Sequence, residues 1–282
     1  MKANVSRAMP AAAPWAEAEG RALAWRGEAV GPEPGVDPPS SLTTMSWYQR
    51  REWRRQLEAL SDEFTVVAWD APGAGRSSDP PETFGLADWA DCLAAFIDAL
   101  GLERPHVVGL SFGGGLALEL FRRHPAVPRT LILTSAYAGW AGSLPAEVVE
   151  ERLQLMLRNC DLPSDRWAPA WIETLLAEDA TTEMVAELML IASELHPAGT
   201  RVAMRAFAEA DLRDVPPRID VPTLLLYGER DVRASKDVWG PLHEGIRRSK
   251  LVLIPDAGHM IDIEAADRFN AEVRDFLRDV GG

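Results

Sequence analysis

Short buried strands alternate with amphipathic helices along most of the chain. Apolar runs rich in leucine and β-branched residues, typical of strands covered on both faces, occur at residues 64–69, 106–110, 130–134, 222–227 and 251–254. Helical spacing of apolar positions predicts helices at residues 51–60, 87–100, 116–123, 236–247 and 265–280. This alternation predicts an α/β fold, with a mostly parallel, doubly wound sheet and helices on both faces.

The alternation stops between the third and fourth runs. Residues 139 to about 216 contain no strand-like run, only helical spacing with several tryptophans and methionines. The pattern predicts a helical cap at 139–216, inserted after the 130–134 strand over the carboxyl edge of the sheet. The core would then comprise residues 21–138 and 217–282. Most Trp and Met side chains of the cap are expected to pack between helices, and a few to face a pocket.

The first fifty residues follow no such pattern. We expect residues 1–20 to form a disordered leader and residues 21–26 to form an opening strand. The prolines and glycines of residues 31–41 argue against regular structure there.

Composition narrows the classes of function. The 29 Lys and Arg against 43 Asp and Glu give a net charge of −14, which argues against nucleic acid or an anionic membrane as partner. Cys92 and Cys160 are too few for a disulfide framework and lack metal-ligand spacing, so a reducing compartment fits. No apolar stretch has signal-peptide or transmembrane length. We therefore expect a cytoplasmic protein with a small-molecule partner, and the oligomeric state stays open.

The tightest turn of the sequence surrounds Ser111. Gly109 and Gly113 flank it in the spacing G-x-S-x-G, at the junction of a predicted strand and a predicted helix. Glycines at these positions allow the strand and helix to approach closely and expose the serine hydroxyl. The same spacing also occurs in ordinary glycine-rich connections, so the motif alone leaves both interpretations open.

Two further loops carry residues that would activate a serine. Asp231 follows the 222–227 strand, and His259 follows the 251–254 strand. Carboxyl ends of parallel strands share one edge of the sheet, where ligands and catalytic groups collect. A serine hydroxyl is a weak nucleophile at neutral pH and needs an imidazole to accept its proton and a carboxylate to orient that imidazole.

These motifs together resemble the α/β-hydrolase superfamily. The resemblance rests on Y-G-E-R-D ending at Asp231, P-D-A-G-H-M-I-D-I-E around His259, and D-A-P-G-A-G-R-S starting at Asp70. It runs from about Arg51 to the C-terminus, interrupted by the predicted cap. The order Ser, Asp, His along the chain is also that of this superfamily.

The resemblance implies an enzyme that hydrolyses a small carboxylic ester or related acyl compound. Ser111 would be the nucleophile, His259 the general base and Asp231 its orienting carboxylate, with the Phe112 N–H in the oxyanion hole. No metal or organic cofactor is implied. Glu229 and Asp256 remain alternative acids, while Asp70 and Arg76 are expected to fix a loop beside the pocket. The remaining histidines are expected to be structural: His106, His124, His196 and His243.

Other reactions use the same triad. Enol-lactone, carbon–carbon bond and aminopeptidase-type hydrolysis and perhydrolase chemistry are alternatives, as is a catalytically impaired binding homologue. The sequence of the cap does not distinguish them.

One segment departs from the superfamily pattern. Members usually have an apolar strand ending in His-Gly before the helix near Arg51, and the loop that follows supplies a second oxyanion donor. Thr44 and Met45 stand in that position here. Losing one donor typically lowers turnover by about 10²–10³-fold, so weak activity is one expectation.

Two accounts of this segment are open. Residues 41–48 could still form the strand, since Thr, Trp and Tyr suit one, with an amide near Met45 or Ser46 completing the hole. Alternatively, the segment reflects a local reading-frame error, because offset reading with G/C-ending codons can give a Val-Leu-Leu run followed by histidine. The nucleotide sequence of the gene distinguishes the two.

Overall fold

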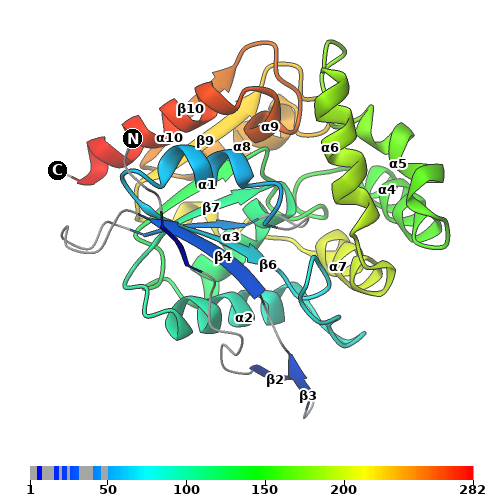
Figure 1. The fold of residues 1–282 in the computed structure, drawn as a ribbon, viewed down its shortest axis with the longest axis horizontal. Helices are drawn as coiled ribbons and strands as arrows, with labels where there is room; N and C mark the ends of the chain where they lie inside the picture. Colours follow the sequence, from blue (N-terminus) through cyan, green and yellow to red (C-terminus); the bar gives the residue numbers. More distant parts are fainter. Residues whose placement is uncertain are drawn as a thin grey trace.

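An eight-stranded sheet forms the centre of the protein (Figure 1). The computed structural model describes the backbone of residues 5–7, 16–18, 21–23, 26–31, 41–45 and 50–281, and side chains from 50 to 280. The strand order is β1-β4-β6-β5-β7-β8-β9-β10. Strands β5 to β10 pair in parallel, while β4 pairs antiparallel with β6 and β1 with β4. The strand bounds are β1 Val5–Arg7, β4 Arg26–Gly31, β5 Ser41–Met45, β6 Thr65–Asp70, β7 His106–Leu110, β8 Thr130–Thr134, β9 Thr223–Gly228 and β10 Ser249–Ile254.

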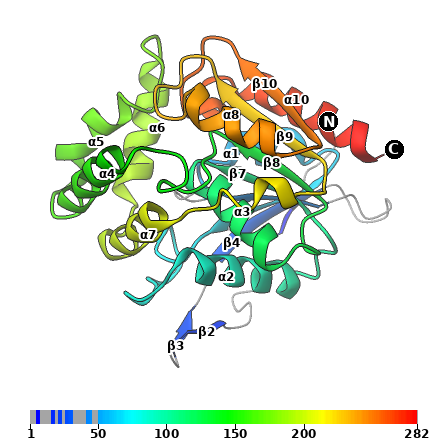
Figure 2. The ribbon, with the colours of Figure 1, turned by 180° about the vertical axis from the view of Figure 1, so that it is seen from behind.

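Helices cover both faces of this sheet. On one face, α1 (Arg54–Leu60) packs against α10 (Ala266–Gly281), and on the other α2 (Leu86–Ala99) packs against α3 (Phe112–Arg123) (Figures 1 and 2). Helix α8 (Lys236–Gly245) contacts β9 and β10. The predicted α/β fold with a mostly parallel sheet is therefore confirmed.

The buried stripe of α10 shows why these residues form a packed helix. Phe269, Val273, Phe276 and Leu277 recur at the three- and four-residue spacing of one helix face, and all four are buried.

Four helices lie between β8 and β9, beside the carboxyl ends of the strands (Figure 1). They are α4 (Ala146–Asn159), α5 (Ser164–Ile172), α6 (Thr182–Ser193) and α7 (Pro197–Glu209). We call these helices and the loops that join them the helical insert. A β-bridge joins Leu195, between α6 and α7, to Ala74 in the loop after β6. The insert therefore contacts the loops at the carboxyl edge of the sheet.

The N-terminal predictions need correction. The first two strands of the main sheet along the chain are β1 and β4. The predicted opening strand instead falls partly on Arg21–Leu23, which forms β3 and pairs with β2 (Ala16–Ala18) outside that sheet. Part of the leader predicted as disordered is also strand, in β1 and β2. These segments are strands because their backbones pair with neighbouring strands. Their own amino-acid composition does not indicate a strand. The proline- and glycine-rich residues 32–40 lie outside the described residues.

The atypical segment before α1 does form a central strand. Strand β5 pairs in parallel with β6 through Ser41–Thr65 to Thr44–Ala68, and with β7 through Leu42–His106 to Met45–Gly109. This arrangement agrees with the first account of the segment, with the strand ending at Met45. Residues 46–49 lie outside the described residues.

Candidate active site

Ser111 occupies a strained turn between β7 and α3. Its backbone has φ 54° and ψ −111°, a left-handed φ that non-glycine residues rarely adopt. Strand and helix approach so closely that a Cβ atom on Gly109 would lie 2.2 Å from the Gly113 carbonyl oxygen. Such strain typically costs about 1–3 kcal/mol and persists where the surrounding structure enforces it.

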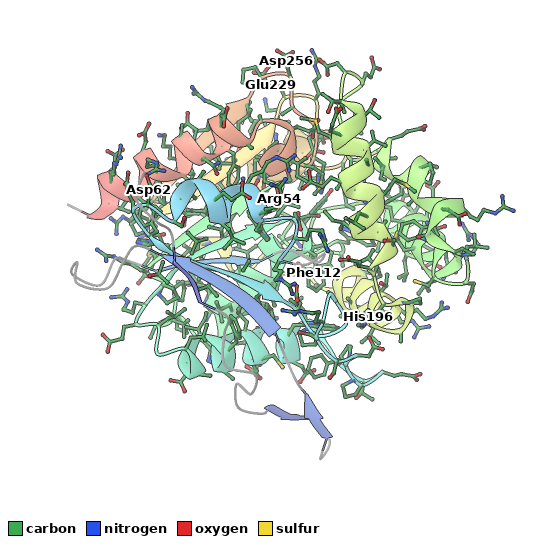
Figure 3. All side chains as sticks on the ribbon, viewed as in Figure 1. Arg54, Asp62, Phe112, His196, Glu229 and Asp256 are labelled. Carbon is green, nitrogen blue, oxygen red and sulfur yellow. The ribbon has the colours of Figure 1, made fainter. Side chains whose placement is uncertain are left out.

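Packing of the next residue holds this turn in place. The buried Phe112 ring, labelled in Figure 3, lies with its centroid 5.0 Å from the ring of Phe207 on α7 and 6.0 Å from that of Trp89 on α2. The Ser111 carbonyl accepts hydrogen bonds from the N–H groups of Gly114 and Gly115, at 3.0 and 3.2 Å. The backbone N–H of Phe112 is thereby fixed in the first turn of α3, where the helix dipole favours negative charge.

Asp231 and His259 form a buried pair. His259 Nδ1 lies 2.8 Å from Asp231 Oδ2, with side-chain exposures of 1% and 0%. Asp231 Oδ1 accepts hydrogen bonds from the N–H groups of Arg233 at 2.8 Å and Ala234 at 2.9 Å. Burial alone would raise the pKa of Asp231, but the charge of His259 and these hydrogen bonds hold that pKa below its usual value. Asp231 is therefore placed to orient the imidazole.

The end of β8 joins the serine turn to the histidine loop. Ser111 N–H donates to the Thr134 carbonyl at 2.9 Å, and Ser135 Oγ donates to the His259 carbonyl at 2.8 Å. His259 N–H donates in turn to the carbonyl of Leu175 in the helical insert, at 2.8 Å. Among the described residues, Ser111 Oγ and His259 form no direct hydrogen bond.

Ser111 opens onto a small cavity of about 30 Å³ beneath the helical insert. That volume holds about two water molecules. Aromatic and methionine side chains make up most of its wall, and Arg233 is its one charged lining residue among the described residues: Ser111, Phe112, Trp140, Met156, Trp171, Met204, Phe207 and Arg233. The cavity is therefore apolar apart from the serine and one cation.

The model of the alpha/beta hydrolase family matches residues 34–272. The chain belongs to this family. It is 27% identical over 236 residues to a protein of Yersinia enterocolitica named "Putative carbamate hydrolase RutD", covering 80% of this chain and 82% of that protein. Among solved structures, a thermophilic esterase from Thermogutta terrifontis shares 28% identity with a TM-score of 0.80 (92% and 93% covered). The enol-lactonase from Burkholderia xenovorans shares 25% sequence identity with a TM-score of 0.76, and the match covers 94% of this chain and 100% of that one.

The alternative acids lie elsewhere in this α/β hydrolase. Figure 3 places Glu229 and Asp256 together at the rim of the molecule, away from Phe112. Asp256 is 71% exposed and forms an ion pair with Arg230. The structure therefore pairs His259 with Asp231 and with neither alternative.

The other four histidines have separate partners. His106 Nδ1 lies 2.9 Å from Thr130 Oγ1, and burial lowers its pKa to about 4. The remaining three contact side chains outside the Ser111 cavity: His124 with Asp91, His196 with Asp79 and His243 with Ser249.

Buried Asp70 holds the loop after β6. Its carboxylate accepts hydrogen bonds from Arg50 N–H at 2.9 Å, from the Arg50 guanidinium at 2.8 Å and from Arg76 N–H at 3.3 Å. Ser77 Oγ donates to the Asp70 carbonyl at 2.6 Å. Asp70 therefore ties this loop to the chain just before α1, and Arg76 takes part through its backbone.

Of the described helices, none is long and apolar enough to cross a membrane.

Sequence reasoning did not single out Glu264, which clamps the histidine loop. Its carboxylate accepts hydrogen bonds from the N–H groups of Gly258 at 3.1 Å, Met260 at 3.2 Å and Ala177 of the helical insert at 2.7 Å. Burial raises the pKa of Glu264, although these three donors oppose the rise. Its position five residues after His259 in the quoted motif was the available signal.

We expect Glu264→Gln to loosen the loop that carries His259. The amide has one acceptor oxygen and places an N–H₂ group against backbone donors, so unmade hydrogen bonds would cost about 1–3 kcal/mol. Activity should fall about tenfold, and thermal melting should shift down by a few degrees. Glu229→Gln removes an exposed carboxylate nearby and should change neither; an equal loss in both variants would contradict a specific clamp.

Asp262, two residues before Glu264, is fully buried and has no hydrogen-bond partner for either carboxylate oxygen among the described residues. Burial raises its pKa to about 8. Between pH 4 and 8 the folded protein thus keeps a proton that the unfolded chain, with a pKa near 3.9, has released. Stability from this group is present at low pH and is lost as pH rises through that window.

We expect Asp262→Asn to remove this pH dependence. As pH rises from 5 to 8, the wild type should lose several degrees of melting temperature that Asp262→Asn keeps. Melting curves at matched ionic strength measure this. Asp279→Asn changes an exposed carboxylate of α10, and its melting temperature should depend on pH as that of the wild type does. If the melting temperature of Asp262→Asn also depended on pH as in the wild type, the pH dependence would not come from Asp262.

Proposed function

We propose that this α/β hydrolase cleaves a small carboxylic ester or related acyl substrate through Ser111, His259 and Asp231. The observation that carries the proposal is the buried 2.8 Å contact between His259 Nδ1 and Asp231 Oδ2, at the same sheet edge as the strained Ser111 turn. A buried carboxylate on Nδ1 leaves Nε2 as the nitrogen that can accept a proton from the serine.

The reaction would proceed through an acyl-enzyme. Ser111 Oγ attacks the carbonyl carbon of the substrate while His259 Nε2 accepts the hydroxyl proton. The electrons of the carbonyl bond move onto its oxygen, which accepts a hydrogen bond from the Phe112 N–H. His259 then protonates the departing alkoxide as the carbon–oxygen bond breaks. A water molecule activated by His259 releases the acid and restores Ser111.

The second oxyanion donor is proposed to be a backbone N–H at or next to Met45. Strand β5 ends with Met45 in register with Gly109, two residues before Ser111. A backbone amide can fill this role without the usual His-Gly pair, because the N–H of any residue other than proline is a donor.

The small cavity favours a short acyl group. About 30 Å³ of open space lined by aromatic and methionine side chains leaves little room unless the helical insert shifts. We therefore propose that the insert acts as a cap that opens for the substrate. The names of the relatives make esters, enol-lactones and carbamates the compounds to screen first.

Labelling with a fluorophosphonate probe tests the proposal. An adduct mapped to Ser111 by mass spectrometry, and dependent on His259, is the expected result. A folded protein that forms no adduct would overturn the proposal and favour a binding homologue.

A further inference from the structure

Arg233 brings a positive charge to an otherwise apolar cavity. It lies two residues after Asp231 and lines the same cavity as Ser111. One guanidinium nitrogen, Nη1, donates to Thr174 Oγ1 of the helical insert at 2.9 Å. A guanidinium has five N–H donors, so one hydrogen bond to a neutral hydroxyl leaves most of its capacity unused.

A second arginine supports the first. Arg152 on α4 donates from Nη2 to the Arg233 carbonyl at 3.4 Å and from Nη1 to the Tyr137 hydroxyl at 3.3 Å. The Tyr137 ring centroid lies 6.3 Å from that of His259. Burial raises the pKa of Tyr137, and the charges of Arg233 and Arg152 oppose this rise. Both positive charges therefore act on the space beside His259.

Neither arginine forms an ion pair within the described residues. Two acidic residues of the loops between the insert helices pair with other arginines: Asp161 with Arg201, and Asp179 with Arg230. This contrasts with the chain as a whole, which has 43 acidic residues against 29 basic ones. Arg233 is partly exposed and has no ion-pair partner among the described residues, so its charge is available to an anion that enters the cavity.

We propose that Arg233, supported by Arg152, binds a carboxylate on the substrate, so that the preferred substrate is the monoester of a short dicarboxylic acid. This rests on the proposed function, because the ester carbonyl must reach Ser111 while the free carboxylate reaches Arg233. Guanidinium groups bind carboxylates through two parallel charge-assisted hydrogen bonds. Because Ser111 and Arg233 line one small cavity, only a few carbon atoms separate the two groups.

Binding to the Ser111→Ala variant tests the carboxylate site without turnover. Titration calorimetry would compare monomethyl succinate with its neutral amide, methyl succinamate, which has nearly the same shape. We expect the anionic ester to bind about 10- to 100-fold more tightly, the range of a charge-assisted contact. Adding Arg233→Met should abolish this preference, and Arg233→Lys should restore part of it.

Control variants separate a specific contact from general effects. Arg158→Met removes an exposed charge from the same helix as Arg152 and should keep the full preference. Arg233→Met retains the backbone N–H that holds Asp231, so its affinity for methyl succinamate is the reference against which its loss of affinity for the anionic ester is measured. Equal affinity for the two esters, or equal weakening of both by Arg233→Met, would overturn the proposal.

The two proposals fail in different ways. Ser111-dependent hydrolysis of both esters with no preference for the anion would refute the carboxylate site and leave the hydrolase function standing. Preferential binding of the anion by Ser111→Ala, with no hydrolysis by the wild type, would refute the function and leave the carboxylate site standing.

Discussion

Alanine at Ser111 or at His259 is expected to lower kcat by about 10⁴–10⁶-fold for any ester that the wild type hydrolyses. Without Oγ there is no nucleophile for the acyl-enzyme, and without the imidazole the hydroxyl keeps its proton. Both variants should also lose fluorophosphonate labelling. Steady-state hydrolysis, followed by proton release, and mass spectrometry of the labelled protein measure the two effects.

The double variant distinguishes a cooperating pair from two separate contributions. If Ser111 and His259 act in one step, Ser111→Ala/His259→Ala should be no slower than either single variant, because each substitution already removes the whole pathway. Ser193→Ala on α6 and His243→Ala on α8 are controls outside the cavity and should keep wild-type activity. Substantial hydrolysis by Ser111→Ala would contradict the nucleophile assignment.

The core strands could be predicted from sequence because both of their faces are buried. Residues 106–110 and 130–134 were predicted with the bounds that β7 and β8 have in the structure, and every residue in both is buried. A strand that is buried on both faces has a continuous apolar run in the sequence. Such a strand can be recognised from its own residues, without knowing which strands pair with it.

The N-terminal strands could not be predicted in the same way. Strand β5, S-L-T-T-M, is short and largely polar, and its pairing with β6 and β7 places it in the sheet. Strands β1 and β2 have still weaker strand composition, with sequences V-S-R and A-E-A. Where pairing with distant partners decides the conformation, local propensity is a poor guide.

A similar limit applies to the site. Ser111, Asp231 and His259 each follow a strand, so the fold alone brings them to one edge. Arg233 and Glu264 matter because of contacts with the helical insert, through Thr174 and Ala177, which are distant in sequence. No sequence spacing predicts the contacts of Arg233 with Thr174 or of Glu264 with Ala177. The position of the Arg233 charge in the cavity is therefore known only from the folded structure.

Asp231→Asn is the second variant with a large expected effect. Asparagine has nearly the same shape but can donate from Nδ2 to His259 Nδ1, which favours the tautomer that carries its proton on Nε2. That nitrogen could then no longer accept the proton of Ser111. We expect kcat to fall by about 10³–10⁴-fold with the fold intact, measured on the ester used for the Ser111 variants.

The same substitution should change acid stability in a defined direction. The pKa of Asp231 lies below its usual value in the folded protein, so its ionised form stabilises the fold at pH values above the unfolded pKa. That contribution is lost as pH falls through the lowered folded pKa. The melting temperature of Asp231→Asn should therefore lie below that of the wild type at pH 7, and the difference should shrink below about pH 4.

A matched substitution shows whether the effect belongs to this carboxylate. Asp237→Asn, on an exposed side chain of α8, should leave both activity and acid stability unchanged. Full activity in Asp231→Asn would require another acid to orient His259. Glu229 and Asp256 are both exposed, and Asp256 is already paired with Arg230, so that result would imply a rearranged loop in solution. Retention of activity would thus count against the arrangement of the β9 and β10 loops as well as against the role of Asp231.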